Sequence, residues 1–308
     1  MASKVKATTS KQSKKWLVFV DTNVLLDLYR LPGESAKRTL DTLEQHRSSL
    51  ILTDQVWMEF LKNRQKVISK TIENIRKPTQ HNLPSVVGEL PAGKQFLKHQ
   101  TVRSKAHDKL IEAIEKLLKN PGTDPVYRCL NRIFAGDATY NLKRPNKKRY
   151  AVREAAQKRF SLGYPPRKDD TLRLGDAINW EWIIQCAMIS KCNVVIVSRD
   201  GDFGLTYGQD CILNDWLRVE FKERVSRKRK IELTNRLSTA LRKLHIPLAP
   251  GDVEEETKLI SATDIPDDAI SVLLSRVLQR QARLPEGSDP LRSWFADPLS
   301  PNNNKNNK

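Results

Sequence analysis

The stretch WLVFVDTNVLLDLY, residues 16–29, decides how this chain is expected to fold. Five apolar residues, Trp16 to Val20, lead without a break into a carboxylate, Asp21, and apolar residues resume at Val24. A short continuous apolar run is typical of a strand buried on both faces of a parallel sheet. A charged residue directly after such a run is expected where the strand stops, at its carboxyl end and outside the core.

Two further apolar runs, at 50–52 and 193–197, predict two more buried strands. Apolar residues at helical spacing lie between the runs, with the longest stripe reaching from Val56 to Ile75. Buried strands that alternate with amphipathic helices predict an α/β fold with three layers, α/β/α, around a mostly parallel central sheet.

The middle and the end of the chain predict additions to this α/β domain. The stretch 77–165 is expected to be a helical insertion without strands, with helices near 94–118, 126–135 and 147–160. The stretch 213–244 also has a helical pattern of leucines. The expected divisions are a disordered basic arm at 1–14, the α/β domain at 15–220 with its insertion, a helical C-terminal extension at 221–285 and a polar tail at 286–308.

The charge balance predicts a polyanionic partner. The chain has 54 Lys and Arg residues against 36 Asp and Glu residues, a formal net charge of +18. Such an excess favours nucleic acid, because phosphate neutralisation releases counterions, although a solubilising surface is the simpler reading. The residues expected to hold a nucleic-acid backbone are Lys143, Arg144, Lys147, Lys148, Arg149, Arg153, Arg159, Arg227, Lys228 and Arg229.

Other sequence features narrow the protein class. No apolar run is long enough for a transmembrane helix, and the N-terminus lacks the apolar core of a secretory signal. The four cysteines have no CxxC spacing, which favours a reduced, cytoplasmic protein and argues against a zinc-binding site. The five histidines show no metal spacing, and neither a phosphate-binding P-loop nor a GxGxxG motif is present.

Acidic residues follow or interrupt several apolar elements. Asp21 follows the first predicted strand, and Asp200 and Asp202 follow the third, in VVIVSRDGDFG. Strand ends of a parallel sheet meet at one edge, so these acids are expected to lie together. Glu59 lies about one turn into a helix in QVWMEFLKNR, and Asp176 opens a helix in GDAINWEWII. The predicted carboxylate cluster is Asp21, Glu59, Asp176 and Asp200, with Asp202 nearby.

Each acid alone has a simpler interpretation. Asp21 and Asp176 stand where helix N-caps are common. Asp200 precedes a glycine, as in many turns, and Glu59 has basic neighbours on its own helix. The hypothesis of a functional cluster rests on the combination, because each acid adjoins an apolar element that should be buried.

A carboxylate cluster of this kind predicts a divalent metal. Like charges a few ångströms apart cannot all stay ionised unless cations offset their repulsion. Mg²⁺ prefers oxygen ligands, and Mn²⁺ behaves similarly. Two such ions about 4 Å apart can activate a water molecule and stabilise the leaving oxygen of a phosphodiester.

Four segments resemble the successive acidic motifs of PIN-domain nucleases: VFVDTNVLLDLY, QVWMEF, GDAINWEWII and IVSRDGDFG. Their order matches the family, with Asp-Thr-Asn after the first strand, Glu on a helix, Asp opening a late helix and Asp-x-Asp-Phe after a later strand. The resemblance covers residues 16–76 and 165–217. The long insertion and the GYPPRK segment at 163–168 are similar to a bacterial PIN-like group.

The resemblance implies a PIN-like α/β/α fold and metal-dependent hydrolysis of single-stranded nucleic acid, usually RNA, that leaves a 5′-phosphate and a 3′-hydroxyl. The catalytic and metal-binding residues that it implies are Asp21, Glu59, Asp176 and Asp200, with Asp202 as a fifth metal ligand. Thr22 and Asn23 would orient the first of them. Lys168 could face a scissile phosphate or lie in an exposed loop. Arg199 could hold a phosphate or pair with a carboxylate.

Two other functions stay open at this point: a structure-selective DNA nuclease, and a non-catalytic nucleic-acid-binding protein whose acids only cap helices. The family's toxins are compact, whereas this chain adds an insertion and an extension. An inhibitory or accessory protein partner and the oligomeric state therefore also stay open.

Overall fold

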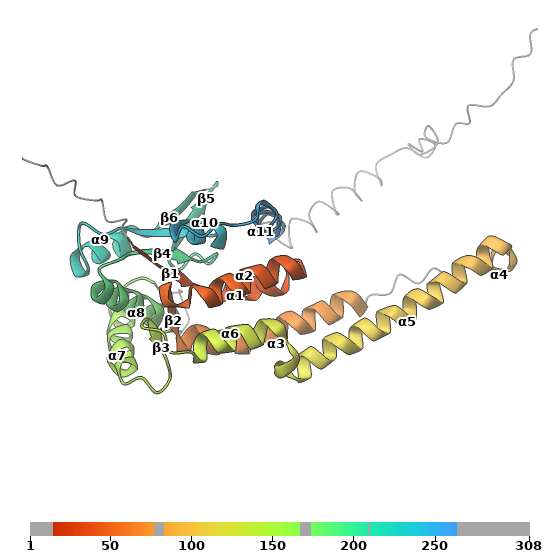
Figure 1. Cartoon of the computed structure of the whole chain (residues 1–308), viewed down its shortest axis with the longest axis horizontal. Coiled ribbons are helices and arrows are strands. Elements are labelled where there is room, and N and C mark those ends of the chain that lie inside the picture. The colour runs from red at the N-terminus through yellow and green to blue at the C-terminus, as the bar shows by residue number, and fades with distance from the viewer. Residues whose placement is uncertain (1–14, 77–82, 167–173, 209, 264–308) are drawn as a thin grey trace, which may run out of the picture. The chain divides into compact units, whose positions relative to one another are not determined.

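The computed structural model describes residues 15–76, 83–166, 174–208 and 210–263. The chain divides into two compact units, Met1–Leu259 and Ile260–Lys308, and the fold described below belongs to the first. Its centre is a five-stranded sheet in the order β3-β2-β1-β4-β7, in which all neighbours are parallel (Figure 1). The strands are β1 (Trp16–Val20), β2 (Leu50–Thr53), β3 (Asn141–Leu142), β4 (Asn193–Val197) and β7 (Ile231–Thr234).

The predicted strands form the buried middle of this sheet. Every residue of β2 and β4 is buried, as are the last four residues of β1. In β1, Val18 is in register with Leu50 on one side and Val195 on the other. Continuous burial of this kind arises when helices cover both faces of a parallel sheet. The α/β fold class is therefore confirmed.

Helices cover the two faces because the chain changes direction along the sheet. It moves one way from β1 through β2 to β3, and the other way from β3 to β4 and β7. Right-handed crossovers then place the connecting helices on opposite faces. Accordingly, α8 packs against β2 and β4, and α10 packs against β1, β4 and β7. These helices and their neighbours are α1 (Thr22–Leu26), α2 (Gly33–Gln45), α8 (Gly175–Ser190), α9 (Asp215–Arg224), α10 (Leu237–Lys243) and α11 (Pro250–Thr263).

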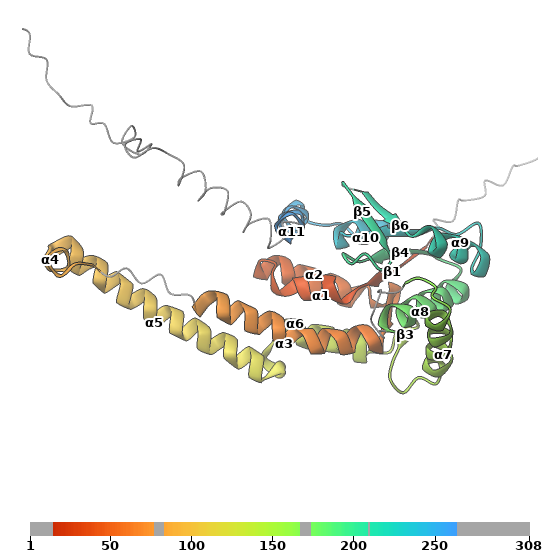
Figure 2. The ribbon, with the colours of Figure 1, turned by 180° about the vertical axis from the view of Figure 1, so that it is seen from behind.

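Helix α3 (Asp54–Arg76) precedes the predicted insertion at 77–165. The described part of that stretch contains the helices α4 (Ser85–Glu89), α5 (Pro91–Lys119), α6 (Pro125–Ala135) and α7 (Lys148–Ser161). Helices α3 and α5 pack side by side as a helical arm, with α4 beyond one end of α5 (Figures 1 and 2). None of the helices within the described residues is long and apolar enough to span a membrane.

A buried polar cluster fixes the base of this arm. Asp124 caps α6 by accepting hydrogen bonds from two backbone N–H groups of its first turn. Its other oxygen accepts from Arg64 Nε at 2.7 Å and from Tyr29 Oη at 2.5 Å. Arg64 also donates to the carbonyl of Leu117 at 2.6 Å. Since Arg64 and Asp124 are both buried, this cluster joins α3, α5 and α6 at one point.

Two details of the prediction were wrong, and one element was missed. The stretch 213–244 is divided into α9, β7 and α10 rather than being one helical segment. The insertion contains β3, which has only two residues and therefore shows no periodicity in the sequence. A separate antiparallel hairpin, β5 (Gly204–Tyr207) and β6 (Asp210–Leu213), was not predicted. The basic arm at 1–14, Lys168 and residues 264–308 lie outside the described residues.

Candidate metal centre

The candidate site lies at the carboxyl edge of the sheet, between β1 and β4. The chain leads from β1 to β2 and β3 on one side, and from β4 to β7 on the other. Such a reversal opens a crevice beyond the strand ends, where ligands bind in open α/β folds. Asp21 directly follows β1, and Asp200 follows shortly after the end of β4. The topology thus places one acid on each side of the crevice.

Asp21 is buried and held by three hydrogen-bond donors. Its carboxylate accepts from Thr22 N at 2.6 Å, from Ser198 Oγ at 2.6 Å and from Asn23 Nδ2 at 3.1 Å. Ser198 Oγ in turn accepts from the backbone N–H of Asp200 at 3.2 Å. Asp21 is also the N-cap of α1. The cap interpretation therefore holds for this residue, whose side chain also lines the candidate site.

Glu59 and Asp176 reach the same place from two helices. Glu59 Oε2 accepts from Thr22 Oγ1 at 3.2 Å, and Glu59 Oε1 accepts from Gln55 Nε2 at 2.7 Å. A Cβ atom added to Gly175 would lie 2.5 Å from Glu59 Oε1, so the first residue of α8 touches this carboxylate. Asp176 is the next residue of that helix. Glycine at 175 therefore lets the first turn of α8 approach Glu59 closely, and Asp176 lines the same cleft as Glu59.

One cleft of about 410 Å³ collects the four acids. It is lined by Asp21, Glu59, Asp176 and Asp200, together with Thr22, Asn23, Leu26, Gln55, Met58, Lys62, Asn63, Lys66, Leu174 and Gly175. Asp202, the fifth predicted ligand, is half-buried and is not among the residues that line the cleft. Residues from α1, α3, α8 and the loop after β4 thus share one hollow, although they are far apart in the sequence.

The electrostatics of the cleft disfavour its full negative charge. Burial raises the pKa of Asp21 to about 6, and the nearby carboxylates of Asp200 and Glu59 add to this effect. The hydrogen bonds from Ser198 and Thr22 act in the opposite direction, because they stabilise the ionised form. An added cation would relieve the repulsion among these carboxylates.

The residues of the cleft fit a hard divalent cation in their chemistry. They offer carboxylate oxygens, which Mg²⁺ and Mn²⁺ prefer, and the buried Asp21 is already short of positive partners. Within the described residues, however, no three His, Cys, Asp or Glu side chains lie close enough to hold one ion together. The acids therefore share a cleft without converging on a single point.

A model of the PIN domain matches residues 18–203, more than half of the 308-residue chain. The chain belongs to the PIN-domain family. This is a family of metal-dependent nucleases, and the matched range contains all five predicted acids. Neither the curated proteins nor the solved structures gave a match.

Two of the predicted supporting residues contact Asp21, and a third contacts a different acid. Thr22 and Asn23 both donate to Asp21. Arg199 forms an ion pair with Asp27 and donates to the carbonyl of Asn235 at 3.3 Å. Of its two interpretations, pairing with a carboxylate is the one that the structure shows. Lys168 lies outside the described residues.

Sequence reasoning missed Ser198 and Gln55, which contact two of the acids. Ser198 Oγ is 2.6 Å from Asp21, although the two residues are 177 positions apart. Gln55 precedes Glu59 by one helical turn and donates to it. The spacing of four residues was a usable signal for Gln55, whereas nothing in the sequence relates Ser198 to Asp21.

The predicted basic residues are not equally available to a ligand of the PIN domain. Arg144, Lys147 and Lys148 are exposed. Ion pairs engage three others: Lys143 with Asp137, and Arg149 and Arg153 with Asp54. The cluster at 227–229 precedes β7, so it lies at the amino edge of the sheet, opposite the cleft.

The prediction for Arg159 as a nucleic-acid contact was wrong. Its side chain is buried, with 4% of its surface exposed, and pairs with Glu181 at 2.9 Å and also with Glu220. Arg224 binds the same two carboxylates at 2.7 Å each. This α7–α8–α9 charge cluster, made of Arg159, Glu181, Glu220 and Arg224, holds three helices together and leaves no positive group for a phosphate.

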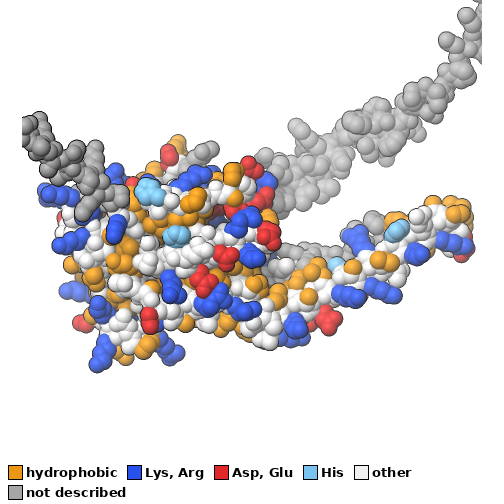
Figure 3. Space-filling model, viewed as in Figure 1, with side chains coloured by type: hydrophobic (Ala, Val, Ile, Leu, Met, Phe, Trp, Pro, Cys, Tyr) orange, Lys and Arg blue, Asp and Glu red, His pale blue; other side chains and the backbone are white. Residues whose placement is uncertain are grey.

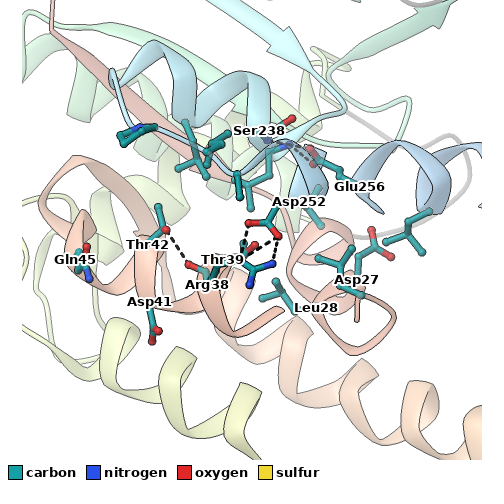
Figure 4. A pocket seen from close by; sticks show the side chains of 18 of the residues that line it. Asp27, Leu28, Arg38, Thr39, Asp41, Thr42, Gln45, Ser238, Asp252 and Glu256 are labelled. Atoms are coloured by element: carbon teal, nitrogen blue, oxygen red, sulfur yellow. Dashed lines mark hydrogen bonds and ion pairs between the residues drawn. The ribbon is translucent and has the colours of Figure 1, made fainter. Parts of the chain in front are cut away.

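A second cavity of the PIN-domain chain contains none of the predicted metal ligands. It has a volume of about 280 Å³ and lies between α2 and the segment from α10 to α11. In its wall, Arg38 donates to both carboxylate oxygens of Asp252, from Nη2 at 2.6 Å and from Nε at 3.0 and 3.2 Å (Figure 4). Glu256 accepts from the first backbone N–H groups of α10. Since these charges are already paired, the acidic cleft is the better candidate for chemistry.

Proposed function

We propose that the chain is an endonuclease that hydrolyses phosphodiester bonds of single-stranded nucleic acid, with RNA as the preferred substrate. The observation that carries this proposal is the meeting of Asp21, Glu59, Asp176 and Asp200 in one cleft at the carboxyl edge of the sheet. Four separate elements supply these acids, and helix capping alone gives no reason for all four to share a hollow.

In the proposed site, the four cleft carboxylates would hold Mg²⁺ or Mn²⁺, with Asp202 as an outer candidate ligand. When bound, such ions supply water activation and stabilisation of the leaving oxygen. Thr22 fixes the relative position of Asp21 and Glu59, because its backbone N–H donates to one and its hydroxyl to the other. Ser198 sets the orientation of Asp21 and binds the backbone of Asp200.

The surroundings of the cleft favour a polyanionic substrate. Lys62 and Lys66 line the cleft beside the acids and are exposed. Arg144 and Lys147 follow the carboxyl end of β3, which belongs to the same edge of the sheet, and both are exposed. These positive groups would offset the repulsion between the acids and an approaching phosphate backbone. The basic cluster at 227–229 is not included in the proposed site, because it lies at the amino edge of the sheet, opposite the cleft.

The test is a comparison of three labelled substrates: single-stranded RNA, single-stranded DNA and a DNA flap. Cleavage of RNA that requires Mg²⁺ or Mn²⁺ and stops with a chelator is the expected result. Asp21→Asn should remove cleavage, whereas Asp41→Asn, at an exposed acid on α2 away from the cleft, should not. Preferential cleavage of the flap would instead identify a structure-selective DNA nuclease. Binding that a chelator leaves intact, without any cleavage, would identify a non-catalytic binding protein.

The proposal includes a reducing, cytoplasmic setting. All four cysteines are free, and three of them are buried. Buried thiols of this kind act as small apolar side chains and need no oxidising compartment. The proposal leaves room for an inhibitory or accessory protein partner.

A further inference from the structure

Three lysines follow the catalytic acid Glu59 along one face of α3. Lys62, Lys66 and Lys70 are spaced by four residues, so they repeat at about 6 Å along the helix axis and span about 12 Å. All three side chains are exposed. We call this set the α3 lysine row. The buried residues Val56 and Phe60 occupy another face of α3, which turns the row outward.

The α3 lysine row begins inside the cleft and continues out of it. Lys62 and Lys66 line the cleft together with the four acids. Lys66 and Lys70 line a second, shallow groove between α3 and α5, where Lys119 joins them. Because Lys66 lines both hollows, the two adjoin at this residue. Glu73 also lines this groove and follows Lys70 on α3, so the run of lysines is followed by an acid.

The row differs from several other basic groups near the cleft and the groove in having no ion-pair partners among the described residues. None of its three lysines forms an ion pair with another residue in the described part of the chain. In contrast, Arg149 and Arg153 pair with Asp54, and Lys119 pairs with Glu115 at 3.2 Å. Figure 3 shows further Lys and Arg side chains along the arm. Unpaired charges at a regular spacing favour a ligand whose own charges repeat, which a single nucleic-acid strand provides.

From this continuity we infer that the α3 lysine row is a binding path for the phosphate backbone of the substrate strand, leading from the acidic cleft along the helical arm. The inference rests on the proposed nuclease function and adds to it the direction in which the strand leaves the site. Each lysine would neutralise one phosphate and release its counterions, so the binding is sequence-independent and salt-sensitive.

The experiment measures RNA binding by the full chain in the Asp21→Asn background, where substrate is not consumed. Lys70→Met and Lys66→Met/Lys70→Met remove charge and keep the apolar stem. Lys37→Met on α2, at an equally exposed lysine away from the path, is the matched control. The probes are single-stranded RNAs of about 16 and about 4 nucleotides, the two ends of the usual range for one binding site.

For the long RNA, Kd is expected to rise about three-fold for the single variant and about ten-fold for the double variant, because each variant loses phosphate contacts. In a plot of log Kd against log salt concentration, the slope should fall by about 0.7 for each lost contact. The short RNA should respond less to Lys70→Met, because it can be held within the cleft. Lys37→Met should match the parent in both measurements.

Two failures can be told apart. If the long RNA binds but the salt slope is the same for the parent and the double variant, the path is refuted and the nuclease proposal stands. If no single strand binds the parent at any salt concentration, the proposed function fails and the path fails with it.

Discussion

Two groups of carboxylates in this chain each contain one buried acid, Glu181 in one and Asp21 in the other, yet they are neutralised differently. In the α7–α8–α9 charge cluster, Glu181 and Glu220 each contact both Arg159 and Arg224. Burial alone would raise the pKa of Glu181, but hydrogen bonds from the two arginines outweigh it, and the pKa lies below the ordinary value. In the acidic cleft, by contrast, burial and neighbouring acids raise the pKa of Asp21 to about 6.

The difference shows which group is complete by itself. Two arginines balance two glutamates inside the protein, so the α7–α8–α9 charge cluster needs nothing from solution. The cleft holds four acids, and the two lysines that line it have no ion pair with a described residue. Substitutions should therefore affect folding in the first group and ligand-dependent activity in the second.

The largest expected effect on stability comes from breaking the balanced cluster. Arg159→Met should lower the free energy of unfolding by about 3–5 kcal/mol, because it leaves the buried Glu181 and the half-buried Glu220 with one arginine between them. Arg153→Met, whose exposed side chain pairs with Asp54, should cost less than about 1 kcal/mol. Urea denaturation with chelator present measures both. Similar losses for the two variants would remove the distinction between the clusters.

The largest expected effect on activity comes from the cleft. Asp200→Asn should reduce Mg²⁺-dependent RNA cleavage by more than about 100-fold. Mutation of a residue that only hydrogen-bonds to a metal ligand already lowers metal affinity or activity by about 10- to 100-fold. Its Tm in the absence of metal should stay close to that of the parent, because the variant removes a repelling charge. A variant that cleaves as fast as the parent would contradict the assigned role of Asp200.

The third expected effect depends on pH. The folded-state pKa of Asp21 lies above the ordinary 3.8, so the folded chain binds more protons between 3.8 and about 6, and stability falls as the pH rises through that window. Without metal, Asp21→Asn should therefore be more stable than the parent by about 2–3 kcal/mol near neutral pH, at 1.36 kcal/mol per unit of pKa.

This gain should shrink as the pH falls toward 4, because the parent's Asp21 is then protonated as well. Denaturation at a series of pH values with chelator present measures the difference. A gain that stays constant with pH would mean that the charge of Asp21 is not its source.

The smallest expected effect concerns the contact between α8 and Glu59. Gly175→Ala places a methyl group 2.5 Å from Glu59 Oε1 and forces that carboxylate to move. Since the end of a glutamate side chain can rotate, the stability cost should stay near 1 kcal/mol, whereas activity should fall about ten-fold. Gly33→Ala on α2, where no atom lies within 4 Å of the added carbon, is the control. Equal activity of the two variants would show that Glu59 tolerates displacement.

Much of the cleft was predictable because its acids adjoin buried elements. Asp21 and Asp200 follow strands whose continuous apolar runs identify them, and the carboxyl ends of parallel strands meet at one edge. Gly175 and Asp176 belong to a recognisable sequence motif, but the sequence did not predict that Gly175 contacts Glu59. These features depend on local sequence and on a single rule of topology.

The parts that escaped prediction depend on long-range pairing. Arg159 looked like a surface charge because its partners are 22 and 61 positions away along the chain. The strand β7 was hidden in a run of leucines at helical spacing, and its place beside β4 is set only by the sheet. The spacing of four residues in the α3 lysine row is visible in the sequence. The neighbouring apolar stripe predicted the helix, and the lysines on its other face were not considered.

Helix α3 carries Glu59 and the lysine row on one uninterrupted rod of 23 residues. Their mutual angle is therefore set by the helical phase alone. One extra residue inserted between Asn63 and Lys66 would rotate everything beyond it by about 100°, so Lys66 and Lys70 would point away from the cleft, whereas seven extra residues would nearly restore the original angle. Changes in the length of this helix between related chains should accordingly come in whole turns.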